Sequence, residues 1–198
     1  MMEGSFDRVL HEFHALHEGV PALRDFMDWP RDLAPQKIHP FHIPAADLMT
    51  QDKGLTCQTE LSSLRDAIIA AGPHAQWRET YKGTWISDDF MQRFGCYCII
   101  GEGGPYVCAQ NSAYMVYMPK GLDYPLHHHP AEEMYYIIAG EAEFRIKGEV
   151  PKRLGSGDHV FHPSNAPHAT RTYNAPMLAL VLWRGDLVTS PVLTEAGP

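Results

Sequence analysis

The chain has 198 residues, of which 44% are hydrophobic, so it is long enough for one domain with a buried core and too short for two of ordinary size. Sixteen basic against twenty-four acidic residues give a formal net charge of −8 without any basic run, which argues against nucleic acid or an anionic membrane as a partner. No hydrophobic run approaches the ~20 residues of a membrane span, and the amino terminus lacks a basic region followed by an apolar one. A soluble cytoplasmic protein is therefore expected.

The first ninety residues are predicted to be mainly helical. Apolar residues recur at helical spacing over residues 6–17 and 20–27, and a further helix is predicted over 61–71. Residues 32–44 are rich in proline and predict an extended connector. Three histidines spaced three apart in the first helix indicate a polar helix face: His11, His14 and His17.

From residue 94 onward the pattern changes to short segments that alternate with glycine- and proline-bearing turns. Aromatic, β-branched and aliphatic residues predict strands over 94–100, 113–118, 134–138, 142–147, 159–162 and 177–183. The fold class predicted is all-β: a single small antiparallel barrel, or jelly roll, with an N-terminal α-helical extension. Residues 1–90 are assigned to the extension, which packs on the barrel, and residues 91–198 to the barrel, within one structural domain.

The four cysteines, at positions 57, 96, 98 and 108, show neither a CxxC pair nor a zinc-ribbon spacing. Cys96 and Cys98 would point to the same side of a strand, where small thiols usually fill the core. Reduced thiols with a structural role are expected in a reducing compartment.

A run of histidines predicts a metal site. Side chains alternate across a strand, so His127, His129 and Glu133 share one face if the step at Pro130 preserves the parity, and His168 is the natural last ligand. Imidazole nitrogens and a carboxylate oxygen suit Zn, Fe, Mn, Ni or Co, and an open position beside them indicates a catalytic site.

The alternative is that the histidines form a solvated loop or a barrel that has no metal. A loop does not require Glu133 and His168 at matching distances, so the metal site is the favoured interpretation. His128 has the opposite parity and is expected to face away. His159 and His162 are interpreted as packing residues of the core or surface.

The order of these residues resembles the two sequence motifs of the cupin family. The resemblance covers roughly residues 95–184, with asparagine at position 165, where the family often has glycine. The residues that carry it are Gly121, His127, His129, Glu133 and Gly140 in the first motif, and Gly157, Asp158, Pro163 and His168 in the second.

Three aromatic residues narrow the resemblance. Tyr135 lies two positions after Glu133 and should point into the same cavity, Tyr124 lies on the predicted loop before the histidines, and Trp183 comes near the end of the last strand. With the N-terminal helices, this set resembles the small bacterial cupin-type dimethylsulfoniopropionate lyases.

The resemblance implies cleavage of dimethylsulfoniopropionate to dimethyl sulfide and acrylate by base-catalysed β-elimination, with one divalent transition metal ion as cofactor. Tyr135 is the favoured base, as a phenolate beside the metal, and Tyr124 is its rival. Trp183 and Tyr124 are expected to hold the sulfonium of the small zwitterionic substrate by cation–π attraction. A homodimer is one candidate assembly.

Two other classes of function remain open. An iron-dependent cupin dioxygenase of the acireductone or quercetin type keeps the glutamate and would consume oxygen. A cupin that binds a sugar or metabolite without catalysis would retain its ligand after chelation and after Tyr135→Phe.

Overall fold

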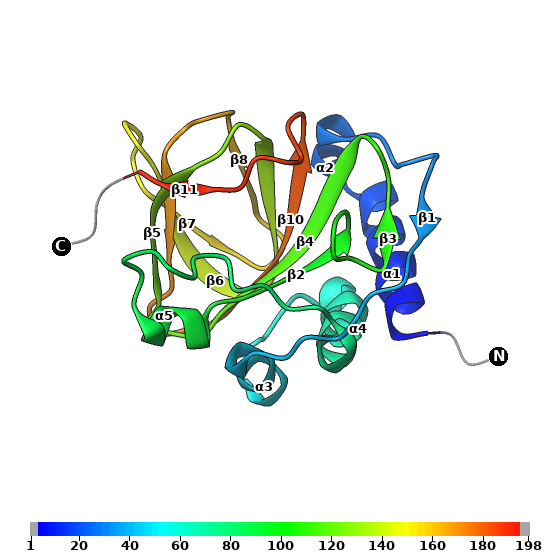
Figure 1. Ribbon diagram of the computed structural model, residues 1–198, viewed down its shortest axis with the longest axis horizontal. Coiled ribbons are helices and arrows are strands. Elements are labelled where there is room, and N and C mark those ends of the chain that lie inside the picture. The colour runs from blue at the N-terminus through cyan, green and yellow to red at the C-terminus, as the bar shows by residue number, and fades with distance from the viewer. Residues whose placement is uncertain (1–3, 195–198) are drawn as a thin grey trace.

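In the computed structural model, which describes residues 4–194, the helices precede the long strands of the barrel (Figure 1). The helices are α1 (Ser5–Gly19), α2 (Pro21–Phe26), α3 (Pro44–Gln51), the 3-10 turn η1 (Thr59–Leu61), α4 (Ser62–Ala71), the 3-10 turn η2 (Gly72–His74) and α5 (Asp88–Arg93). The strands are β1 (Ala34–Pro35), β2 (Gly95–Ile100), β3 (Tyr106–Val107), β4 (Asn111–Met118), β5 (Asp123–His128), β6 (Glu132–Ile146), β7 (Lys152–Gly155), β8 (His159–His162), β9 (His168–Arg171), β10 (Met177–Arg184) and β11 (Val192–Leu193).

The strands form one continuous sheet in the order β1-β3-β2-β4-β10-β6-β9-β5-β11, with β7 and β8 also paired to β6. Except for β2 with β3, the pairings are antiparallel. β6 belongs to two parts of the sheet, since its first half pairs with β8 and β10 and its second half with β7 and β9. This strand therefore folds the sheet around a cavity. The predicted fold class, a single cupin barrel with N-terminal helices, is confirmed.

One prediction about the strands is wrong: the segments expected at 134–138 and 142–147 are a single strand, β6. Gly140 lies between them with φ of 72°, a conformation that residues with a Cβ rarely adopt. The register of β6 with β10 shifts at the same level, between Leu178 and Ala179. Such a bend changes the direction of a strand without ending it. The sequence predicted a turn at Gly140, and the structure has a bend within β6 there.

Replacing Gly140 with alanine is expected to destabilise the protein strongly. The new Cβ would lie 1.8 Å from the carbonyl oxygen of Pro176, in addition to the cost of the left-handed backbone, about 1–2 kcal/mol. Gly148→Ala is the matched control, because Gly148 has φ of 91° but no atom within 4 Å of the place that a Cβ would occupy. Thermal unfolding should show a clearly larger fall for Gly140→Ala; equal falls would contradict the steric explanation.

The central strands are buried on both faces. In β10, Leu178, Leu180 and Leu182 belong to a cluster with the helices, whereas Val181 and Trp183 belong to a second cluster inside the barrel. The same alternation runs through β4 and the first half of β6. Helices α1 and α4 therefore cover the outer face of the sheet, as Figure 1 shows, and leave the inner face to the cavity.

The helices follow the predictions in part. α1 and α2 match the two helices expected at the start of the chain, but His17 is buried, with Nε2 2.9 Å from the carbonyl oxygen of Met27, so it does not belong to a polar face. The short α3 and α5 were not predicted. α3 begins at Pro44, directly after the extended segment. Proline is tolerated in the first turn of a helix, where its missing N–H would have no partner in any case.

The boundary expected between residues 90 and 91 stays a prediction. The hydrophobic cluster between the helices and the outer face of the sheet contains residues from both sides of this boundary. Phe13 and Ile68 come from helices, and Met115 and Leu180 come from strands, which supports assignment to one structural domain. Between residues 4 and 194, no helix has the length and apolar character needed to cross a bilayer.

Candidate metal and substrate-binding site

Strand register brings the site together from distant parts of the chain. His127 on β5 lies opposite His168 on β9. Glu133 on β6 lies between two partners, Trp183 on β10 and His162 on β8, so these three side chains form a row across neighbouring strands. His129 follows the end of β5, and its parity with His127 is preserved. The histidines and Glu133 are almost completely buried.

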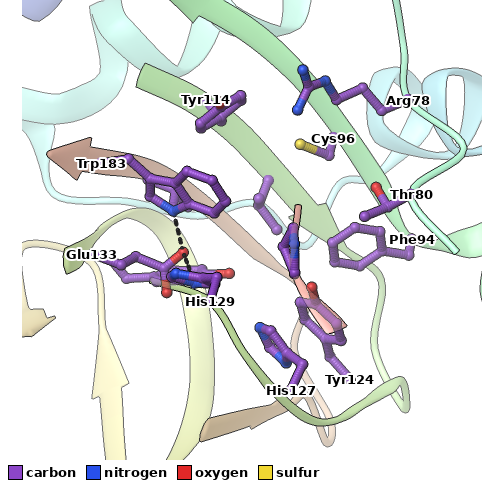
Figure 2. A pocket seen from close by; sticks show the side chains of 14 residues that line it. Arg78, Thr80, Phe94, Cys96, Tyr114, Tyr124, His127, His129, Glu133 and Trp183 are labelled. Atoms are coloured by element: carbon purple, nitrogen blue, oxygen red, sulfur yellow. Dashed lines mark hydrogen bonds and ion pairs between the residues drawn. The ribbon is translucent and has the colours of Figure 1, made fainter. Parts of the chain in front are cut away.

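Of these residues, His127, His129, Glu133 and Trp183 line a cavity of about 60 Å³ inside the barrel. A water molecule requires about 10–15 Å³ of such space, so the cavity accommodates a small molecule of a few water-sized groups. Figure 2 shows Glu133 and His129 on one side, and Tyr124, Phe94 and Thr80 on the other. The remaining lining residues are Arg78, Cys96, Tyr114, Val116, His127, Tyr135, Val181, Trp183 and Pro191.

Three histidines are oriented by the same type of hydrogen bond. Nδ1 of His127, His129 and His168 lies 2.9, 3.0 and 2.8 Å from a backbone carbonyl oxygen two residues away in the chain. A carbonyl oxygen only accepts, so each Nδ1 carries a proton, and in the neutral ring each Nε2 is then an unprotonated acceptor. Burial, followed by the neighbouring His168, also lowers the pKa of His127 well below its ordinary value. In their neutral form these imidazoles present the lone pairs of their Nε2 atoms to the site.

The arrangement of these acceptors fits a cation. Nε2 of His129 and of His168 is buried without a hydrogen-bond partner within residues 4–194, and each faces the carboxylate of Glu133, at 3.4 and 3.1 Å. Acceptors that face one another without a proton between them repel unless a positive charge is present. Ligand atoms about 2.0–2.1 Å from a tetrahedral or octahedral metal lie about 3.0–3.4 Å from each other, which is the separation found.

The possible ligands form two overlapping groups that share His168. Ligand atoms of His127, His129 and His168 lie within 4.8 Å of one another, and so do those of Glu133, His162 and His168. His162, which was interpreted as a packing residue, is thus part of the candidate metal site. Its Nδ1 lies 2.7 Å from Oε2 of Glu133.

Glu133 is held as a carboxylate from two sides. The indole Nε1 of Trp183 donates to Oε1 at 2.7 Å, and Nδ1 of His162 donates to Oε2. Burial opposes the charged form, but the hydrogen bond that His162 donates favours it, and the pKa of Glu133 lies well below its usual range. Trp183 therefore has a role beyond the aromatic surface that the sequence predicted, because it orients the carboxylate.

The two candidate tyrosines have different surroundings. Tyr124 lies on β5, not on a loop as expected; its ring stacks on His127 at 4.0 Å and its hydroxyl lies 2.7 Å from that of Tyr81. The Tyr135 hydroxyl has no hydrogen-bond partner among the described residues. Burial raises the pKa of both phenols well above 10, and the charge of Glu133 raises that of Tyr135 further. Each is a neutral phenol unless a nearby cation compensates.

Other residues fall where their side-chain parity or context places them. His128 faces away from the cavity and its Nδ1 lies 2.9 Å from the hydroxyl of Thr194. His159 is exposed. The four cysteines are free, and Cys96 and Cys98 both face the barrel interior, where Cys96 lines the cavity. Burial raises the pKa of the Cys96 thiol to about 11, so it is a neutral wall residue.

Three contributors to the site could not be identified from spacing: Tyr81, His162 and Arg78. Tyr81 and Arg78 belong to an irregular segment before the barrel, with no motif to mark them. His162 carried one usable signal, because it ends the strand that leads into the second histidine motif. Only the β6–β8 register places it beside Glu133.

The metal-free protein is expected to lose stability as pH falls below about 6.5. Burial lowers the pKa of His127 and His162 in the folded protein, whereas unfolded imidazoles titrate near 6.5. Below that pH the unfolded chain binds more protons than the folded chain, so protonation favours unfolding. Thermal unfolding of chelated protein from pH 7.5 to 5 measures the slope. His162→Asn should flatten it and exposed His11→Asn should not; an unchanged slope in His162→Asn would contradict the assignment.

The barrel, its buried histidines and Glu133 define a cupin with a site that could bind a metal. The chain belongs to the dimethylsulfoniopropionate (DMSP) lyase family, whose model matches residues 24–179.

The similarity to solved and curated members of that family extends over nearly the whole chain. It is 59% identical over 190 residues to dimethylsulfoniopropionate lyase DddQ of Ruegeria pomeroyi, which covers 96% of this chain and 94% of that protein. The crystal structure of DMSP lyase DddQ from Ruegeria pomeroyi DSS-3 matches with a TM-score of 0.94, 58% identity and 96% coverage of both chains. A structure described with the DMSP lyases RdDddP and RnDddQII matches with a TM-score of 0.92 and 35% identity, over 96% of this chain and 98% of that one.

Proposed function

We propose that the protein is a metal-dependent lyase that cleaves dimethylsulfoniopropionate to dimethyl sulfide and acrylate. The observation that carries the proposal is the convergence of imidazole Nε2 atoms and the Glu133 carboxylate beside a small cavity whose wall includes three phenols, those of Tyr114, Tyr124 and Tyr135. The names of the similar proteins support the substrate.

The proposed metal ligands are His127, His129, Glu133 and His168, and the ion is divalent Zn, Fe, Mn, Ni or Co. When bound, the cation would offset the negative charge of Glu133 and of the substrate carboxylate, which makes the adjacent C–H more acidic and a phenolate accessible. The second group, with His162, supports a role for that residue in holding Glu133 in place.

The proposed reaction needs one base and no acid. The base removes a proton from the carbon next to the carboxylate, and the electron pair of that C–H bond forms the carbon–carbon double bond. The C–S bond breaks with its pair remaining on sulfur, so the leaving group departs as neutral dimethyl sulfide. The proton stays on the base until it passes to solvent.

Tyr135 is proposed as the base, with Tyr124 as the alternative. The free hydroxyl of Tyr135 supports this assignment, because the hydroxyl of Tyr124 is already paired with that of Tyr81. A sulfonium is a diffuse cation with no hydrogen-bond donor, which aromatic faces attract by about 0.5–2 kcal/mol. Trp183 and Tyr124 line the cavity and are proposed to bind it, together with Tyr135.

The wall of the cavity supports the chemistry because it is mainly apolar. Apolar and aromatic residues make up most of the cavity wall, so the charges of the reacting groups are little screened there. The free cysteines support a cytoplasmic location. A homodimer stays a prediction.

Headspace gas chromatography of protein mixed with dimethylsulfoniopropionate, with and without a chelator, tests the proposal, and an oxygen electrode is read in parallel. Release of dimethyl sulfide that a chelator stops, without oxygen uptake, is the expected result. Oxygen uptake would favour a dioxygenase. Tight ligand binding without product, after chelation, would favour a binding protein.

A further inference from the structure

Tyr81 lies directly behind one wall of the cavity and touches it through a single polar contact. Its hydroxyl oxygen lies 2.7 Å from that of Tyr124, and the two residues are only 3% and 4% exposed. Their rings meet edge to face, with centroids 5.8 Å apart. Tyr124 lines the cavity whereas Tyr81 does not, so Tyr81 reaches the cavity through Tyr124.

The bond between the hydroxyls of Tyr81 and Tyr124 is the only hydrogen bond that either hydroxyl forms within the described part of the chain. Among residues 4–194 neither hydroxyl has another hydrogen-bond partner, so the loss of one leaves the other buried and unsatisfied. The ring of Tyr124 stacks on His127 at an interplanar angle of 11°. The position of Tyr124 is therefore coupled to that of a proposed metal ligand.

Tyr81 is itself held in place. Its carbonyl oxygen accepts from both the backbone N–H and the hydroxyl of Thr84, at 3.1 and 2.8 Å, and its ring packs edge to face against Phe90. Its neighbours Arg78 and Thr80 line the cavity on the side opposite Glu133 (Figure 2). The segment around Tyr81 thus forms part of the wall, and Tyr81 anchors it to β5.

We propose that Tyr81 is a positioning residue that holds Tyr124 in the orientation required at the substrate cavity, an inference that rests on the lyase function proposed above. Tyr81 does not touch the substrate. Its effect on the reaction passes through its hydroxyl to the phenol of Tyr124, and from there to the surface that faces the substrate and to His127.

The first test is a double-mutant cycle with Tyr81→Phe, Tyr124→Phe and the double variant. Tyr81→Phe keeps the ring and removes only the hydroxyl, and it should lower kcat/KM about tenfold, as expected when a buried hydroxyl loses its partner. It should alter kcat or KM in the same proportion as Tyr124→Phe does. In the Tyr124→Phe background it should have no further effect, because the contact no longer exists.

Tyr97→Phe is the matched control. Tyr97 is also buried and its hydroxyl donates to the carbonyl oxygen of Ile68 at 2.8 Å, but it does not line the cavity. It should lower the unfolding temperature about as much as Tyr81→Phe while leaving kcat/KM unchanged. Wild-type rates for Tyr81→Phe, or an equal loss in the Tyr124→Phe background, would overturn the proposal.

A second measurement does not depend on turnover. In protein with carbon-13 in its tyrosine rings, the Tyr124 resonances are identified by their disappearance in Tyr124→Phe. They should shift or narrow in Tyr81→Phe and stay in place in Tyr97→Phe; unmoved resonances in Tyr81→Phe would overturn the positioning role. If the wild-type protein released no dimethyl sulfide, the lyase proposal would fail, whereas this measurement would still decide whether Tyr81 holds Tyr124.

Discussion

Glu133→Gln is expected to lower bound metal and lyase activity together, each by about 100-fold or more. The amide can still accept a hydrogen bond from Trp183, but its NH₂ group meets the Nδ1–H of His162, so two donors face each other at the position of a 2.7 Å contact. The substitution also removes the negative charge that favours a cation. Loss of a ligand exceeds the 10–100-fold effect of a residue that only supports one. Elemental analysis per chain and initial rates measure both quantities.

Glu132→Gln is the control for this substitution. Glu132 is the adjacent residue on β6 and forms an ion pair with Arg184 at 2.7 Å, outside the cavity lining. It should keep metal and activity near the wild-type values. Full activity in a Glu133→Gln protein that has lost its metal would contradict the metal-dependent mechanism.

Tyr135→Phe is expected to lower kcat by about 10²–10⁴-fold, the usual contribution of a positioned general base. The variant keeps the ring, which is packed edge to face against Phe144, so folding and metal content should be preserved. Only the group that removes the proton is lost. Single-turnover rates at saturating substrate, with the metal content measured on the same sample, separate the chemical step from binding.

Tyr124→Phe provides the comparison that decides the assignment. Its expected effect is smaller, because it removes a hydroxyl that is already hydrogen-bonded to Tyr81 and leaves the aromatic face in place. A loss in Tyr124→Phe larger than that in Tyr135→Phe would transfer the role of base to Tyr124.

The parts of the site that could be predicted depend on local periodicity. Alternation along β5 and β6 predicted that His127, Glu133 and Tyr135 face one way and His128 the other, because two-residue periodicity needs only the identity of a strand. The barrel class was predictable for a related reason, since β2, β4 and β10 are apolar segments bounded by turns.

The contacts that could not be predicted depend on which strands are neighbours. Glu133 meets His162 and Trp183 through the pairing of β6 with β8 and β10, over 29 and 50 residues of sequence. Tyr81 meets Tyr124 across 43 residues from a segment with no repeating pattern. The sequence indicates which side chains share one face of a strand, but not which strands are neighbours. These hydrogen bonds could therefore be identified only from the structure.

Gly140 shows a different limit. A glycine between two apolar runs predicts a turn, and here it allows one long strand to bend and serve both halves of the sheet. The deciding feature is the carbonyl of Pro176 close above it, a tertiary contact that leaves no trace in the local pattern.

Because β10 is buried on both faces, only one strand separates the cavity from the layer of helices. Trp183, which orients Glu133, is the next residue after Leu182, which packs under the helices. A change of side-chain volume beneath α1 or α4 can therefore shift β10 by fractions of an ångström, although no residue that lines the cavity is replaced. Substitutions of Leu178, Leu180 or Leu182 on the outer face should consequently alter the turnover rate or the substrate specificity, although none of these residues lines the cavity.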